Sequence, residues 1–169
     1  VIGTNGYEQE YNFTIIPNVE FNVNGSIVNF EEGKSYENAS YIKVKVSNVD
    51  YILLNGVAYS SNTYIYNFGN HTILIYGTNG YVFEMNFTKE AIFFFFLEGK
   101  EYSSYTVISC NYAQKLELNG TSFSNGSSLL TIGNHTFTAY GEGDYVKEVH
   151  FTIKPYFYTS GSTYMSASG

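Results

Sequence analysis

The stretch Leu54-Asn55-Gly56, followed by Gly69-Asn70-His71-Thr72, occurs twice in this chain. The second copy begins at Leu118 and keeps a constant offset of 64 residues. Of the 35 positions from 54 to 88, 15 are identical in the second copy. A fixed period of this length is typical of domain-sized modules in an array. The repeat therefore indicates how the chain is divided into modules, and it says little about catalytic or binding chemistry.

A partial third copy opens the chain, where 9 of the 12 positions from 3 to 14 match those from 77 to 88. Modules this small bury only about 60% of their unfolded surface, so each should gain from packing on a neighbour. The repeat predicts the following division: 1–17 as the closing strand of an incomplete module, 18–90 as module 1, 91–155 as module 2, and 156–169 as an opening strand or tail.

The composition is that of a protein made of strands and turns. The chain has 18 Tyr and 14 Phe, only two Pro, and 14% charged residues. Its formal charge is −7, and its eight basic residues, all Lys, are scattered. A nucleic-acid binder needs a clustered basic face, so that class is excluded. The longest apolar run, Ile92 to Leu97, is too short to cross a bilayer, so we expect no membrane insertion.

Hydrophobic residues alternate with polar ones along several short segments. In 81–88, for example, Tyr81, Phe83, Met85 and Phe87 share one parity. A period of two predicts half-buried strands, and Thr78-Asn79-Gly80 should join two of them as a hairpin. The predicted strands are 7–14, 19–23, 41–46, 51–54, 64–68, 71–76, 81–88, 105–109, 115–118, 129–132, 135–140 and 145–152.

About seven short strands per module, separated by turn signals, predict an antiparallel β-sandwich. The order Glu-Gly-Lys, Leu-Asn-Gly, Gly-Asn-His-Thr and Phe-Thr resembles the bacterial-type Ig-like modules that occur in tandem in surface proteins and adhesins. The resemblance covers most of 18–155 and implies tandem Ig-like sandwiches with no significant helix. Its motifs are turn and core signatures, which specify a fold better than a function.

The chain contains eight Asn-x-Ser/Thr sequons, whereas its composition predicts roughly three by chance. Several are equivalent in the repeat or lie at positions expected to face solvent, which favours covalent N-linked glycans over an accident of an Asn-rich sequence. The predicted glycosylation sites are Asn12, Asn24, Asn38, Asn70, Asn86, Asn119, Asn125 and Asn134.

Candidates for metal binding or catalysis are few. His71 and His135 are equivalent but lie in separate modules, so we interpret them as turn histidines and expect no metal and no cofactor. Glu142-Gly143-Asp144 is a weak calcium signal. No catalytic constellation is evident, so we expect no enzyme. Cys110 is interpreted as a small buried residue, with an intermolecular bridge or a free reactive thiol as alternatives.

Some aromatic residues have no obvious cover within one module. The run at 93–96 breaks the alternation, and both ends of the chain carry stripes of aromatic residues. Strand edges with unpaired backbone groups, and apolar faces exposed to water, favour association with another chain or module. The predicted interface residues are Phe93, Phe94, Phe95, Phe96, Tyr7, Tyr11, Phe13, Tyr156 and Tyr158.

These observations predict a structural, glycosylated extracellular array that forms a surface stalk or a head-to-tail filament. Its expected partners are copies of itself or adjacent modules of the same array. Either the ends are cuts in a longer array, or one subunit's end strand completes the next by donor-strand complementation. The alternative function is a carbohydrate-binding or other ligand-binding adhesin module that uses exposed tyrosines such as Tyr59, Tyr64 and Tyr66.

Overall fold

A computed structural model describes residue 4 and residues 6–94, 97–103 and 106–155. The predicted all-β class is confirmed, because the only helix in these ranges is the three-residue 3-10 turn η1 (Thr78–Gly80). The predicted interface residues Phe95, Phe96, Tyr156 and Tyr158 lie outside the described residues. No helix in the described part of the chain is long and apolar enough to span a membrane.

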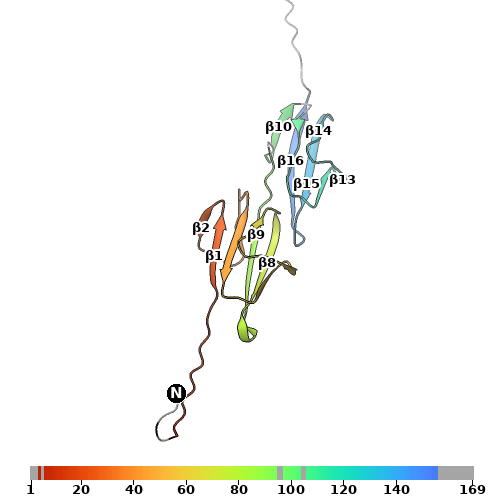
Figure 1. Cartoon of the computed structure of the whole chain (residues 1–169). Coiled ribbons are helices and arrows are strands. Elements are labelled where there is room, and N and C mark those ends of the chain that lie inside the picture. Colours follow the sequence, from red (N-terminus) through yellow and green to blue (C-terminus); the bar gives the residue numbers. More distant parts are fainter. Residues whose placement is uncertain (1–3, 5, 95–96, 104–105, 156–169) are drawn as a thin grey trace, which may run out of the picture.

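Module 1 is built from two sheets, which Figure 1 shows in the lower half of the molecule. The four-stranded sheet has the order β2-β1-β4-β7 and the five-stranded sheet has the order β3-β9-β8-β5-β6. The strands are β1 (Asn18–Val23), β2 (Ser26–Val28), β3 (Lys34–Tyr36), β4 (Ile42–Ser47), β5 (Tyr51–Leu54), β6 (Val57–Ala58), β7 (Tyr64–Ile65), β8 (Gly69–Tyr76) and β9 (Val82–Lys89).

Module 2 repeats the five-stranded sheet, here in the order β10-β16-β15-β12-β13, and faces it with the pair β11-β14. In each module the two longest strands form the predicted hairpin, β8–β9 and β15–β16. The strands are β10 (Lys100–Ser103), β11 (Thr106–Val107), β12 (Lys115–Leu118), β13 (Thr121–Ser122), β14 (Ser128–Leu129), β15 (Gly133–Tyr140) and β16 (Val146–Lys154).

The sheets are antiparallel, as predicted, except at one strand pair in each module. β3 runs parallel to β9, and β10 runs parallel to β16. Both parallel strands follow the Glu-Gly-Lys turns at 32–34 and 98–100. The carboxylates of Glu32 and Glu98 accept hydrogen bonds from the backbone N–H groups of Asn86 and His150, which fixes each turn beside the closing strand. The repeated turn therefore directs the chain onto the outer edge of the five-stranded sheet.

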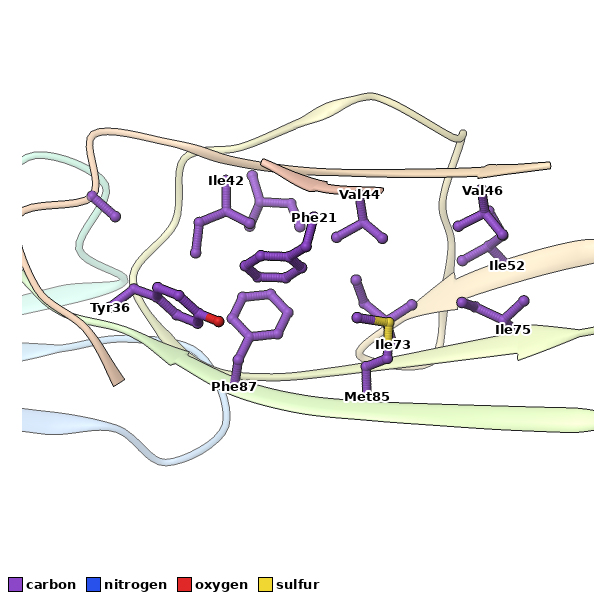
Figure 2. Close-up of a cluster of buried hydrophobic side chains, with 12 residues drawn as sticks. Phe21, Tyr36, Ile42, Val44, Val46, Ile52, Ile73, Ile75, Met85 and Phe87 are labelled. Atoms are coloured by element: carbon purple, nitrogen blue, oxygen red, sulfur yellow. The ribbon is translucent and has the colours of Figure 1, made fainter. Parts of the chain in front are cut away.

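Each module has its own hydrophobic core. In module 1 the side chains come from both sheets, with Phe21 packed edge-on against Phe87 and Ile73 beside Met85 (Figure 2). The alternation predicted for 81–88 holds, because Met85 and Phe87 are buried while Val82 and Glu84 are exposed. The second core is centred on Phe137, Phe151 and Ile153.

Residues 7–14 do not form the predicted strand within this chain. Only Glu8 makes an isolated bridge, and the segment extends away from module 1 (Figure 1). Tyr7, Tyr11 and Phe13 are exposed. The physical reason is that this segment copies β9, and module 1 already has its own β9 between β8 and β3.

The run at 92–97, which breaks the alternation, belongs to no strand in its described residues. Phe94 makes a single bridge to Ser109, and it points outward. Phe93 packs edge-on against Phe137 at 5.7 Å, so it belongs to the core of its own module. The predicted interface role stays a prediction both for Phe93, which is half-buried, and for Phe94.

Candidate functional site: the junction between the modules

The repeated Leu-Asn-Gly and Gly-Asn-His-Thr motifs form a latch inside each module. Asn55, with a left-handed φ of 50°, accepts a hydrogen bond from the Thr72 N–H at 2.9 Å and places its amide nitrogen 3.2 Å from His71 Nδ1. His71 Nε2 lies 3.1 Å from the carbonyl oxygen of Asn67. Since the Asn55 amide donates to Nδ1, the ring proton lies on Nε2 and is donated to that carbonyl. The neutral His71 ring is thus hydrogen-bonded to Asn55 and to Asn67, which connects three segments at this edge of the sheet.

Module 2 contains the same latch, made by Asn119, His135 and the carbonyl of Thr131. The prediction of turn histidines is wrong, because both rings are buried in strands and pack near a phenylalanine of the closing strand. Burial lowers the pKa of His71, which keeps the ring neutral. Both modules therefore contain the same hydrogen-bonded arrangement of asparagine, histidine and a backbone carbonyl, and its role is structural.

Residues 66–70 lie just before His71 and include Asn67 of the latch. They contact module 2, and we call them the junction strip. Phe68 is 1% exposed, and its neighbours are core residues of module 2. Its ring packs edge-on against Tyr145 at 5.6 Å. The backbone joins as well, because the Glu142 N–H donates to the Phe68 carbonyl and the Asn70 N–H donates to the Glu142 carbonyl, each at 2.9 Å. A side chain of module 1 thus completes the core of module 2.

Glycines allow the two backbones to approach. A Cβ on Gly69 would lie 2.8 Å from the Glu142 Cα, and one on Gly141 would lie 2.5 Å from the Phe68 carbonyl oxygen. A Cβ on Gly143 would lie 2.7 Å from the Asn70 carbonyl oxygen. Real Cβ atoms do not tolerate such distances, so a side chain at any of the three positions would push the modules apart.

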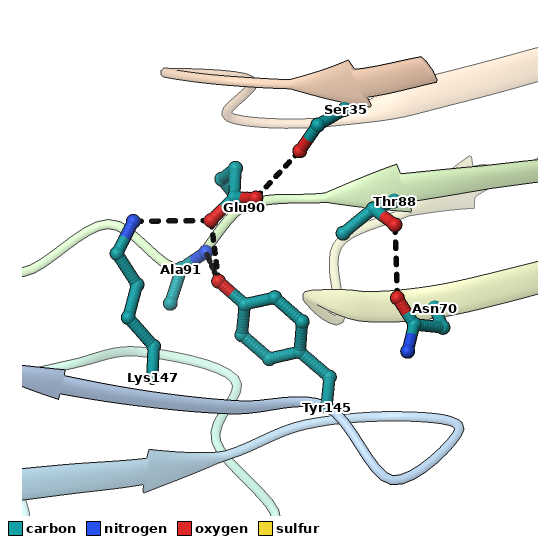
Figure 3. A network of polar contacts seen from close by, with 7 residues as sticks. All are labelled: Ser35, Asn70, Thr88, Glu90, Ala91, Tyr145 and Lys147. Carbon is teal, nitrogen blue, oxygen red and sulfur yellow. Dashed lines mark hydrogen bonds and ion pairs between the residues drawn. The ribbon is translucent and has the colours of Figure 1, made fainter. Parts of the chain in front are cut away.

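Glu90, at the start of the connection between the modules, is the centre of a polar network (Figure 3). Its carboxylate accepts hydrogen bonds from the hydroxyls of Ser35 and Tyr145 and from the Lys147 ammonium group at 3.0 Å. Burial alone raises the pKa of Glu90, but these three donors outweigh burial and hold the pKa below its ordinary value. The tyrosine hydroxyl also accepts from the Ala91 N–H at 3.3 Å. The network links β3 of module 1 to β16 of module 2.

Lys89, the last residue of β9, is only 3% exposed. Burial lowers its pKa from 10.5 to about 8, partly offset by the thiol of Cys110. Cys110 is buried as predicted, and burial raises its pKa to about 12. Module 2 has the buried apolar residue Ile153 at the position equivalent to Lys89. A lysine at this position therefore carries a desolvation cost that the other repeat avoids.

A ladder of tyrosines lies beside the junction. Tyr64 stacks on Tyr66 at 5.4 Å, and Tyr66 stacks on Tyr112 of module 2 at 5.3 Å. The Lys43 ammonium lies 4.9 Å from the Tyr64 ring centroid. These rings line a groove of about 340 Å³ together with Leu54, Val57 and Glu142, among others. Tyr66 stacks with both of its neighbours, so the ladder connects the two modules.

Of the predicted glycosylation sites, seven are exposed and Asn86 is half-buried. Several side-chain amides are already engaged: Asn24 Nδ2 donates to the Asn38 carbonyl, Asn119 Nδ2 to His135, and Asn125 Nδ2 to Asn111. Asn70 Nδ2 donates to the Gly143 carbonyl across the junction at 3.0 Å. Glycosylation stays a prediction. Of the two equivalent sequons, Asn70 is less accessible to a glycan than Asn134, because its amide is engaged at the junction.

The equivalent strip of module 2, residues 130–134, is open, and we call it the distal strip. Ile132 takes the place of Phe68 and is 57% exposed, whereas Phe68 is 1% exposed. Leu130 takes the place of Tyr66 and is 58% exposed. Gly133 has a φ of 129°, close to the 128° of Gly69, but no described residue lies within 4 Å of its ideal Cβ position.

Sequence reasoning did not identify the junction. Phe68, Glu90 and Glu142 fall where the two copies differ, and a comparison of repeats emphasises what is shared. One signal was available: apolar Phe68 comes directly before the repeated glycine, and a strand-end aromatic beside a glycine favours close packing. No group of three or more metal-ligating side chains is present among the described residues, including around Glu142 and Asp144.

No protein family and no curated protein matches this chain. Among solved structures, one similar chain is a Bacteroides ovatus surface glycan-binding protein of a mixed-linkage glucan utilization locus, in complex with a mixed-linkage heptasaccharide. The two share 14% identity over 82% of this chain and 60% of that chain, with a TM-score of 0.31. Another is DIP-gamma IG1+IG2, with 9% identity over 83% of this chain and 99% of that chain and a TM-score of 0.24. This chain therefore spans less than two thirds of the Bacteroides protein.

Proposed function

We propose that this chain is a structural, non-enzymatic part of an extracellular array of β-sandwich modules, in which the junction makes two modules act as one stiff unit. The observation that carries the proposal is Phe68, a residue of module 1 that is buried in the core of module 2. Flexible linkers would leave such a residue at the surface. A stalk or filament needs stiff junctions, because each flexible joint shortens its reach.

The donor-strand version of assembly has no acceptor in the described residues. That mechanism requires a module without its own closing strand. Module 1 has β9 and module 2 has β16, and each lies between two other strands of its sheet. A strand such as 7–14 from another copy therefore finds no vacant place inside either sandwich. The proposal consequently relies on stacked modules and not on exchanged strands.

Carbohydrate binding is the second candidate, and the tyrosine ladder with its groove is the observation that favours it. Sugar binding commonly needs an aromatic face and free polar groups. In the groove, however, the Asn55 and His71 side chains are engaged in the latch and Asn67 Nδ2 donates to Glu142. The geometry therefore supports the structural role better.

Two measurements on natural material test the proposed function. Antibodies to module 2 should label intact cells of the source organism, and glycopeptide mass spectrometry should find sugar on exposed sequons such as Asn12 and Asn134. Recovery only from the cytoplasm, with both asparagines bare, would contradict an extracellular role. A glycan array should give no specific binding, and binding that is lost in Tyr66→Ala would favour the carbohydrate alternative.

A further inference from the structure

We infer that Tyr66 of module 1 and Tyr112 of module 2 form a covalent cross-link when the extracellular chain meets a haem peroxidase and hydrogen peroxide. The product is dityrosine, in which a ring carbon of one tyrosine is bonded to a ring carbon of the other. Cys110 is the only cysteine of the chain, so no disulfide within the chain can join the modules. This inference rests on the proposed function and deepens it, because the bond makes the stiff junction permanent.

The two rings already lie next to each other. Tyr66 belongs to the junction strip, and its ring stacks on Tyr112 with the centroids 5.3 Å apart and the planes 14° apart. Aromatic pairs prefer an offset stack of this kind, which keeps the carbons at the ring edges close to the partner ring. Both side chains are exposed. An oxidant can therefore reach both rings, and each radical forms beside its coupling partner.

The backbone of Tyr112 has an unfavourable conformation. Its φ of 64° lies in the left-handed region, where a bulky side chain is an outlier. The repeat places Asn48, with a φ of 63°, at the equivalent position of module 1. Asparagine tolerates this region because its short polar side chain can form local hydrogen bonds. Module 2 thus has a tyrosine where the backbone suits an asparagine, and the stack on Tyr66 is what the tyrosine provides.

The tyrosine ladder is specific to the junction, because the residues equivalent to Tyr64 and Tyr66 in module 2 are Ser128 and Leu130. Stacking needs only the aromatic ring, which a phenylalanine would also supply. The hydroxyls of Tyr66 and Tyr112 have no hydrogen-bond partner among the described residues. A phenylalanine cannot form a phenoxyl radical, whereas a tyrosine can. Cross-linking therefore uses the one group of each side chain that the stack leaves free.

The reaction oxidises the two phenols and reduces the peroxide. The peroxidase removes one electron and one proton from each phenol, which leaves two phenoxyl radicals. The radicals join through a new carbon–carbon bond between ring positions ortho to the oxygens. Each ring then transfers the hydrogen of its coupled carbon to its own oxygen and becomes aromatic again. Hydrogen peroxide takes up the two electrons and two protons and leaves as two waters, so the chain loses two hydrogen atoms.

Other tyrosines compete for the same oxidant, so the link must be located in the sequence. Tyr51 and Tyr76 form another stacked pair, within module 1, with centroids 4.3 Å apart. Tyr64 also stacks on Tyr66 and can couple to it. Groups held together in one chain have a high effective concentration for each other, so at micromolar chain concentration links within a chain should exceed links between chains.

The experiment treats the full chain at micromolar concentration with a haem peroxidase and limiting hydrogen peroxide. Peptide mapping by mass spectrometry should find the peptides of Tyr66 and Tyr112 joined, with a mass two hydrogens below their sum, as the main link between the modules. The same treatment in concentrated urea should lose this preference, because the stack is then absent. Peptide mapping of natural material should find the same linked pair.

Three variants assign the link to the two phenols. Tyr66→Phe and Tyr112→Phe each keep a ring in the stack and remove one phenol, so each should abolish the link between the modules. Tyr64→Phe is the matched control in the same ladder, and it should keep the link or increase its yield because a competitor is removed. Dityrosine fluorescence from the Tyr51–Tyr76 pair should persist in all three variants and shows that the oxidant acted.

Two results would overturn the inference. The first is an oxidised wild-type chain that contains dityrosine elsewhere but no link between Tyr66 and Tyr112. The second is natural material in which the peptides of both tyrosines are found only unlinked. Neither result affects the packing of Phe68 in the unmodified chain, so the stiff junction would stand. Recovery of the protein only from the cytoplasm would contradict the proposed function, and it would leave the reactivity of the isolated chain unchanged.

Discussion

The junction strip and the distal strip share a glycine with the same left-handed φ and an asparagine that accepts a hydrogen bond from a threonine hydroxyl at 2.8 Å. They differ in what lies against them. Phe68 is buried by module 2, and Ile132 is exposed. This difference indicates that the repeated motif forms the same strand edge in both modules. The residues around that edge determine whether another part of the chain packs against it.

The largest expected contrast comes from truncating the two apolar residues. Phe68→Ala should lower the unfolding free energy of module 2 by about 3–5 kcal/mol, because it leaves a cavity in that core. Ile132→Ala should change it by less than about 0.5 kcal/mol in the monomer. Urea unfolding followed through amide resonances of module 2 measures both. Equal losses would mean that Phe68 is not a core residue of module 2.

The comparison of Lys89 with Ile153 predicts an unusual stabilising substitution. Lys89→Ile should raise the unfolding free energy at pH 7 by on the order of 3 kcal/mol, since burial lowers the lysine pKa from 10.5 to about 8. Between those values the unfolded chain binds more protons than the folded one, so wild-type stability rises with pH. The gap between the two proteins should therefore shrink as the pH rises from 8 toward 10.5.

The control for that substitution is Lys100→Ile, at an exposed position of β10, which should stay within about 0.5 kcal/mol of the wild type at either pH. Chemical denaturation at pH 7 and at pH 10 gives the four values needed. A constant gap between wild type and Lys89→Ile across this range would show that the lysine is not desolvated.

The two glycines give a matched pair in which backbone strain cancels. Gly69→Ala and Gly133→Ala both place a side chain at a φ near 128°, but only Gly69→Ala also meets the Glu142 backbone. We expect Gly69→Ala to cost about 1–3 kcal/mol more than Gly133→Ala. Melting temperatures of the two proteins, measured side by side, check this. An equal cost would mean that the modules are not in close contact at this point.

The smallest expected contrast concerns two tyrosine hydroxyls. Tyr145→Phe removes a donor to the Glu90 carboxylate and should cost about 1.5 kcal/mol, the lower range for hydrogen bonds to a charged group. Tyr81→Phe, at the equivalent position of the β8–β9 turn, should be close to neutral, because the Tyr81 hydroxyl has no hydrogen-bond partner among the described residues. Differential scanning calorimetry resolves this difference if the two variants are compared directly.

The sequence predicted the longer strands of the repeat but not its short edge strands β3 and β10, and it missed the contact between the modules. Periodicity and turn chemistry are local properties of the sequence. They were sufficient to predict that Met85 and Phe87 face the core and that 78–80 form a hairpin turn. The burial of His71 was missed, because a polar residue directly after Gly-Asn is locally typical of a turn. In the fold, Asn55 and the Asn67 carbonyl provide hydrogen bonds for both ring nitrogens, which allows the ring to be buried. The junction was missed for a similar reason: Phe68 and Glu90 acquire their partners only when two modules meet, and no local pattern encodes that contact.

Residual dipolar couplings of backbone amides test the central claim, that the junction makes the two modules one stiff unit, most directly. Couplings from module 1 and from module 2, each fitted to its own alignment tensor, should give tensors of the same magnitude and orientation in the wild type. Phe68→Ala should make the two tensors diverge. Wild-type modules with tensors of clearly different magnitude would show that they move independently, and the account of a stiff structural array would then be wrong.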